Sequence, residues 1–399
     1  MPSVTGKSSL FGDTKAIAKD LLEGCQGNFG KNALGFLCCD ARVDGRQLNR
    51  LVSQALPFPV VGGTSLIMPL TQNPEELSAT LILFEKEGLS VSVSLTDPLD
   101  EDNHAAQVKQ LYEDCLAGLP EAPKLLLPYI PLVPGMTADL FVNALFHLAG
   151  NTPVFGGMTT NDLDAEPAFI FAGGEAYEDR MLLVGLSGPI EPAFAMDAQL
   201  TLVGEHAPRV EASALNVVER VDGMPFCDYL RSIGITPEDR INGIDALVQY
   251  GPLPAQLKNK LPDDFGVPEI RCISYTDVEK GVAAFSSEMP PGTRFNLGLI
   301  LREDVKTSAK RSVDTLKKQM ETGLEKGYEY SLLLAVPCVA RYFAMVGGDN
   351  VETKLLLENL PKQLSVSAYY GFYEIAPVCD GQGVLHNRSN NASIVLCAL

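Results

Sequence analysis

Ionisable side chains near the C-terminus offer the first candidate chemistry. Cys338, Arg341 and Glu352 are followed by a second group, namely Gly371, Tyr373, Glu374, His386 and Asn387. Arginine binds carboxylates bidentately, so Arg341 with two glutamates predicts a polar binding pocket. A thiol with a histidine also suggests a nucleophile, with Cys338 attacking and His386 as its base. The alternatives are a structural ion pair for Arg341 with Glu352 and, favoured for Cys338, a buried unreactive thiol.

Two glycine turns form the second candidate site, after the runs PVVGG at 59–63 and PVFGG at 153–157. A glycine pair at a strand end lets backbone N–H groups approach a ligand, and nearby hydroxyls add donors and acceptors. The predicted contacts are Gly62, Gly63, Thr64, Gly156, Gly157, Thr159, Thr160 and Asp162. Tight strand exits are the structural alternative. Neither turn fits G-x-G-x-x-G or a P-loop, so phosphate cradling is not expected.

The elements that must position these residues alternate between strands and helices. Asp13 predicts the cap of a helix, and residues 33–40 predict a strand buried on both faces. A helix over 45–56 and the strand that ends in the first glycine pair follow. Residues 78–95 then predict two strands joined as a hairpin by Lys86-Glu87-Gly88.

This order recurs along the chain. Residues 104–188 repeat it with the second glycine pair, which lies 94 residues after the first, and 312–399 contain a weaker third copy. The pattern predicts an α/β fold, α+β in part, made of repeated strand–helix–strand–Gly-Gly–hairpin units whose mixed sheets are covered by helices. The 399 residues predict two domains, residues 10–212 and 213–399, after a tail at 1–9.

Composition narrows the function. The formal net charge is −19, and residues 51–200 hold 20 acidic but four basic residues. Nucleic-acid binding and attachment to anionic membranes are not expected, because both need clustered Lys and Arg. The acidity is explained by solubility, and a cationic ligand or partner is the alternative.

Metal and disulfide sites are not expected. The four histidines lie far apart in the sequence, and the nine cysteines include no C-x-x-C pair. Scattered cysteines are typical of reduced thiols in the cytosol. With neither a signal peptide nor a membrane span in the sequence, we expect a cytoplasmic protein without a cofactor.

The motifs and their order resemble the FIST proteins, which pair an N-terminal with a C-terminal FIST domain. The segments that carry the resemblance are PVVGG, PVFGGMTTND, VDGMPFCDYLRSIGI, PCVAR, YYGFYEIAP and LHNRS. The resemblance assigns 10–212 and 213–399 to those two domains. Two departures stand out: Tyr373 precedes Glu374 where the family commonly has glycine, and Thr64-Ser65 follows the first turn instead of a second glycine.

The resemblance implies a sensory module in signal transduction. Such modules bind small ligands, with amino acids or related metabolites proposed, and signal through histidine kinases, cyclic-nucleotide enzymes or chemoreceptors. We therefore expect a ligand-binding protein without catalysis of its own. In this picture Arg341 and the glycine-turn amides bind an anionic group, and Asp162 or a glutamate takes an ammonium.

Three alternatives stay open. The first is a haem-based sensor of a gas such as nitric oxide, with His386 or His147 as axial ligand. The second is a thiol-dependent enzyme that uses Cys338. The third is a scaffold whose acidic N-terminal half binds a basic partner.

Overall fold

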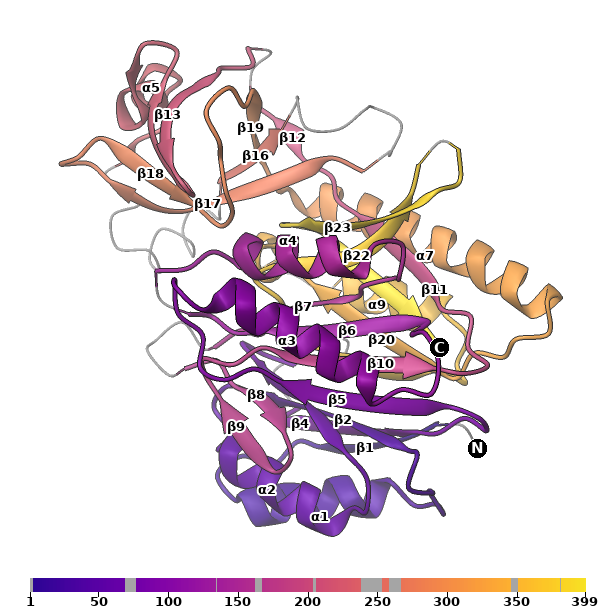
Figure 1. The fold of residues 1–399 in the computed structure, drawn as a ribbon. Coiled ribbons are helices and arrows are strands. Elements are labelled where there is room, and N and C mark those ends of the chain that lie inside the picture. Colours follow the sequence, from indigo (N-terminus) through magenta and orange to yellow (C-terminus); the bar gives the residue numbers. More distant parts are fainter. Residues whose placement is uncertain are drawn as a thin grey trace.

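The computed structural model describes residues 3–68, 77–133, 135–161, 167–203, 206–237, 253–257, 267–345, 351–380 and 382–399. Within them, three sheets share one strand order and a further sheet forms a separate lobe (Figure 1). Mixed sheets with helices on their faces confirm the predicted α/β class.

The first unit contains β1 (Ser3–Ser8), α1 (Thr14–Gly24), β2 (Leu34–Asp40), α2 (Gly45–Ala55), β3 (Val60–Ser65) and β4 (Ala79–Phe84). Its strands lie in the order β1-β4-β2-β3, with β2 and β3 parallel and the other pairs antiparallel. The Asp13 carboxylate caps α1 as predicted, because it accepts hydrogen bonds from the backbone N–H groups of Lys15 and Ala16.

The second unit contains β5 (Ser90–Leu95), α3 (His104–Ala117), β6 (Leu125–Ile130), α4 (Ala138–Ala149), β7 (Gly156–Met158), β8 (Ile170–Ala172), β9 (Glu175–Tyr177) and β10 (Leu182–Ser187). The third contains β11 (Ala193–Asp197), α7 (Arg302–Glu325), β20 (Leu332–Pro337), α8 (Val339–Met345), α9 (Val351–Asn359), β21 (Ser365–Ala368), β22 (Glu374–Cys379), β23 (Leu385–Asn390) and β24 (Ile394–Ala398). Their orders, β5-β10-β6-β7 and β11-β24-β20-β21, repeat the first, with the same parallel pair.

The hairpin predicted over 78–95 is wrong, although both strands exist. β4 pairs with β1 and β2, whereas β5 pairs with β10 in the second sheet. The turn at 86–88 therefore carries the chain from one sheet to the next. Apolar β4 is buried on both faces between two strands, while β5 is partly exposed at a sheet edge. Two hairpins of the repeated units, β8–β9 and β22–β23, each extend the sheet of the preceding unit.

The separate lobe interrupts the third unit between β11 and α7. It contains β12 (Thr201–Leu202), β13 (Val210–Ala214), β14 (Val217–Val221), β15 (Met224–Pro225), α5 (Phe226–Ser232), β16 (Leu253–Leu257), β17 (Glu269–Asp277), β18 (Val282–Phe285) and β19 (Phe295–Leu299). The buried Asn390 in β23 connects the lobe to the core, because its side chain accepts a hydrogen bond from the Ile270 N–H and donates one to the Pro268 carbonyl.

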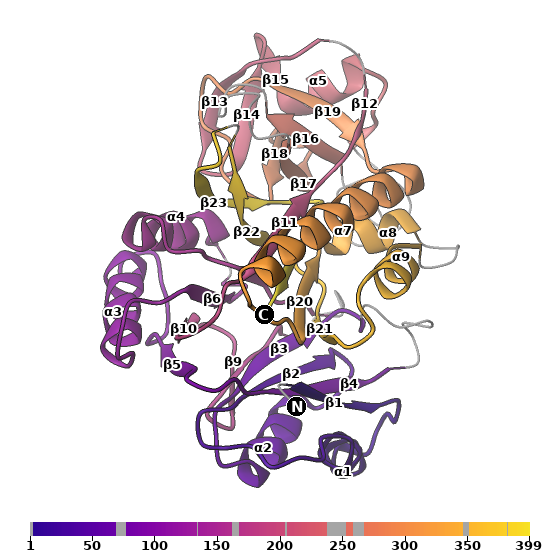
Figure 2. The same ribbon diagram turned by 90° about the vertical axis from the view of Figure 1, so that its right-hand side faces the viewer.

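The inner faces of the three sheets pack on one another, and helices cover the outer faces. In β2, Leu34, Phe36 and Cys38 join the shared core, while Leu37 and Cys39 face the cluster under α1 and α2. The pairs α3/α4 and α7/α9 cover the other two sheets in the same way (Figure 2). Continuous apolar strands are therefore required, because both faces are buried.

Candidate functional site

The carboxyl ends of β3, β7 and β21 meet where the three units join. Thr64 Oγ1 donates a 2.9 Å hydrogen bond to the Thr160 carbonyl, and Thr160 Oγ1 donates one of 2.9 Å to the Tyr370 carbonyl. The Tyr370 N–H donates to Ser65 Oγ at 2.9 Å. The structure thus brings together the predicted residues Thr64 and Thr160, but their hydroxyls connect the units to one another. Thr159 Oγ1 is buried there and has no partner among the described residues.

The glycine pairs lie against neighbouring strands. A Cβ on Gly62 would stand 1.8 Å from the Leu37 carbonyl oxygen, and one on Gly156 would stand 2.3 Å from the Pro128 carbonyl oxygen. Gly62 lies beside β2 and Gly156 beside β6, at matching places in their units. Gly63 packs on Thr159, and Gly157 on the Tyr373 carbonyl. These contacts support the structural alternative, in which glycine permits a close approach between strands.

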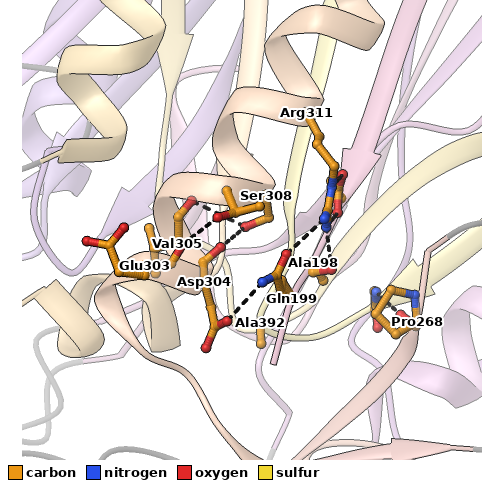
Figure 3. Close-up of polar contacts among 12 residues, drawn as sticks. Ala198, Gln199, Pro268, Glu303, Asp304, Val305, Ser308, Arg311 and Ala392 are labelled. Atoms are coloured by element: carbon orange, nitrogen blue, oxygen red, sulfur yellow. Dashed lines mark hydrogen bonds and ion pairs between the residues drawn. The ribbon is translucent and has the colours of Figure 1, made fainter. Parts of the chain in front are cut away.

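Arg341 and Glu352 form a buried ion pair, with 2.7 Å between Nε and Oε1. The other guanidinium nitrogens donate to Ser308 Oγ and to the carbonyls of Val305 and Ala392, residues that Figure 3 labels around the first turns of α7. All five N–H donors of Arg341 are thereby used by α7, α9 and the turn before β24. This saturation favours the structural ion pair, because a ligand would have to displace one of these contacts.

Glu374 and Cys338 lie together in the interior. Glu374 Oε2 accepts a 3.0 Å hydrogen bond from Ser393 Oγ, while Oε1 has no partner among the described residues. Burial raises the pKa of Glu374 well above its ordinary value, although hydrogen bonds from Ser393 and Cys338 oppose this rise. Burial also raises the pKa of the Cys338 thiol, and the charges of Glu374 and Cys272 add to the rise. The neutral thiol is therefore favoured, which opposes the thiolate that a nucleophile needs.

The remaining predicted residues are spread over separate contacts. Tyr373 donates to the carboxylate of Asp139 on α4, and burial raises the pKa of its phenol. Asn387 accepts a 2.8 Å hydrogen bond from the Val154 N–H. His386 is exposed and contacts Asp380 at 2.9 Å, whereas Cys338 is buried.

Other predicted positions contribute no contact to a site. Gly371 packs beside Val336 and Glu374, and His147 lies exposed on α4. Asp162 lies outside the described residues. Within the described ranges, no cluster of His, Cys, Asp and Glu could hold a metal ion.

A cavity of about 450 Å³ lies between the first and third units. One side is formed by β1 and β4, and the other by β21 and α9, which lie near one another in Figure 2. Ser3 Oγ connects the two units beside this space, because it donates a hydrogen bond to the Ser331 carbonyl at 2.7 Å and accepts one from the Ser365 hydroxyl at 3.0 Å. We call this space the seam cavity.

The lining of the seam cavity mixes apolar and polar groups. Its floor is apolar and includes Leu333, Leu356 and Val366. Lys7 and Lys362 supply positive charge, and Thr80 is 6% exposed with a hydroxyl that has no partner among the described residues. Sequence reasoning missed this site. The available signal was Thr80, a polar residue inside the apolar strand ATLILF.

A second, more open hollow of about 630 Å³ lies between the second and third units. Lys326 and Glu191 line it and pair with each other at 3.3 Å. Its opposite charges are thus partly neutralised, unlike the two lysines of the seam cavity.

Comparisons with known proteins give one family. The model of the FIST N domain matches residues 33–224, so the assignment of 213–399 to a C-terminal FIST domain stays a prediction. Among solved structures, the crystal structure of cyanuric acid hydrolase from A. caulinodans is similar at a TM-score of 0.36 and 10% identity, covering 99% of this chain and 98% of that chain. No curated protein matches the chain. No helix of the described segments is both long and apolar enough to cross a membrane.

Proposed function

Because the chain is a FIST-domain protein, and FIST domains are sensory, we propose that it senses a small molecule bound in the seam cavity. The proposed ligand is an amino acid or related metabolite. The observation that carries the proposal is the cavity itself, with its buried, unpartnered Thr80 hydroxyl. A space of this size, lined by apolar side chains with a few polar groups, is typical of metabolite sites.

The elements around the seam cavity suggest how ligand binding would be transmitted to other parts of the protein. Its walls belong to two units that are far apart in the sequence, so a ligand would contact both at once. One wall includes α9, whose Glu352 bonds the Arg341 side chain that also contacts α7. A shift of α9 would thus be transmitted to the adjoining helices. We propose that a separate output protein, such as a histidine kinase, cyclic-nucleotide enzyme or chemoreceptor, detects this change.

We further propose that the protein works in the cytoplasm and has no catalysis of its own. All nine cysteines lie among the described residues as free thiols, and eight of them are buried. Haem sensing receives less support, because His386 and His147 are both exposed and line neither hollow described above. A thiol enzyme receives less support because the pKa of Cys338 is raised.

Native mass spectrometry and an absorption spectrum of gently purified protein test the proposal. We expect a co-purified small molecule and no Soret band. Val366→Phe, which narrows the seam cavity, should release that molecule. Val378→Phe is the matched control, because Val378 is a partly buried strand residue outside the cavity lining. A Soret band, or a bound molecule that Val366→Phe retains, would contradict the proposal. Equal loss of the molecule from Val366→Phe and Val378→Phe would also contradict it.

A further inference from the structure

The charges around the seam cavity define the class of ligand. Lys7 and Lys362 line it, and no aspartate or glutamate occurs among its described lining residues. The surrounding protein carries a formal net charge of −19, so a cavity with two lysines differs in sign from the molecule as a whole. Both lysines are exposed at the rim of the cavity, and neither forms an ion pair within the described segments.

The cavity lining offers polar groups for one end of a ligand and apolar side chains for the other end. Thr80 presents a buried hydroxyl without a partner, and such a hydroxyl gains from a ligand acceptor or donor. Leu333, Leu356 and Val366 supply an apolar surface for the other end. A buried ammonium group would need an anionic partner, and the described lining offers none.

We propose that the sensor ligand is a metabolite related to the amino acids but without their ammonium group, namely a carboxylate with an apolar body. This inference rests on the proposed function and, of its two ligand classes, selects the related metabolite over the amino acid. The carboxylate binds Lys7 and Lys362 and accepts a hydrogen bond from Thr80. The aliphatic part packs on the leucine-rich floor. A zwitterionic amino acid binds less well, because its ammonium loses hydration without gaining a partner.

Three eight-carbon probes separate the possibilities: octanoate, 2-aminooctanoate and octylamine, each titrated by isothermal calorimetry at pH 7. We expect octanoate to bind at least about tenfold more tightly than the other two. Lys7→Met and Lys362→Met should each weaken octanoate about twofold to fivefold, the loss expected for one ion pair at an exposed lysine. Lys354→Met is the control, because Lys354 lies exposed on α9, where it pairs with Glu358 outside the cavity lining.

Equal or tighter binding of 2-aminooctanoate or octylamine would overturn the ligand class, as would octanoate affinity that both cavity-lysine variants leave unchanged. If Val366→Phe still blocked the binding of 2-aminooctanoate or octylamine, the seam cavity would remain a sensor site, but for a ligand class other than carboxylates. If no probe bound, the carboxylate class would be wrong. The co-purification experiment would then decide separately whether the sensor function also fails.

Discussion

Glu352 and Leu356 lie one helical turn apart on α9 and belong to different neighbourhoods. Glu352 bonds the buried Arg341, whereas Leu356 lines the seam cavity. Both residues belong to the short helix α9 (Val351–Asn359), so one element contacts both environments. Occupancy of the cavity and the geometry of the Arg341 ion pair are thus connected through one element.

This connection predicts that ligand binding stabilises α9. Octanoate should slow amide hydrogen exchange in residues 351–359 and in the first turns of α7, because local opening would break both the cavity and the ion pair. Mass-spectrometric exchange with and without octanoate measures this effect. Helix α1, which lies under the first sheet, is the internal control. Equal slowing in α1 and α9 would argue against a specific connection.

Loss of the Arg341 side chain should cost substantial stability. Arg341→Met leaves Glu352 buried without its counter-ion, and such changes typically cost about 3–5 kcal/mol. Urea unfolding measures the free energy of unfolding. Arg50→Met is the matched control, because Arg50 pairs with Glu175 and more than half of each side chain is exposed, so its loss should cost about 1 kcal/mol or less. Similar losses in both variants would contradict a structural role specific to Arg341.

The buried Glu374 should make stability depend on pH. Its folded-state pKa is raised by burial, so its contribution is fully present below the unfolded pKa and is lost as pH rises through the folded pKa. Glu374→Gln removes this titration. The variant should gain stability relative to the parent as pH rises above the ordinary glutamate range. Urea unfolding from pH 4 to 8 tests this, and parallel pH profiles for the two proteins would refute it.

Glycine at the strand exits should be indispensable for folding. Gly62→Ala places a Cβ 1.8 Å from the Leu37 carbonyl oxygen, so the β2–β3 pair must separate. We expect a loss above about 4 kcal/mol or no folded protein. Gly223→Ala is the control, because Gly223 has a φ of 84° but nothing within 4 Å of the added Cβ, and should cost about 1–2 kcal/mol. Circular dichroism and thermal unfolding distinguish the two outcomes.

The Thr80 hydroxyl should lower the free energy of unfolding of the ligand-free protein and should strengthen the binding of octanoate. Thr80→Val removes a buried polar group without a partner, so the free energy of unfolding should rise by up to about 1 kcal/mol. The same change should weaken octanoate. Ser187→Ala removes another unpartnered buried hydroxyl outside the cavity lining and should leave octanoate affinity unchanged. Thermal unfolding and calorimetry measure the two effects, and unaltered affinity in Thr80→Val would exclude the hydroxyl from the site.

Sequence patterns determined the local elements of this protein. Asp13 marked the start of α1, and the apolar run at 33–40 became β2, because caps and buried runs are encoded within a few residues. The recurring glycine pair marked equivalent strands in two units, where Gly62 and Gly156 face neighbouring carbonyls.

Only the tertiary structure decided which strands pair and where the candidate ligand site lies. β4 and β5 are adjacent in sequence yet join different sheets, because pairing depends on which faces become buried when three sheets pack together. Arg341 obtains hydrogen-bond partners from α7, α9 and the turn at Ala392, so its N–H donors are all used. The sequence alone could not decide between this structural role and ligand binding. Lys7 and Val366 line the same seam cavity although they are far apart in the sequence, and a space between distant segments has no periodic signal in the sequence.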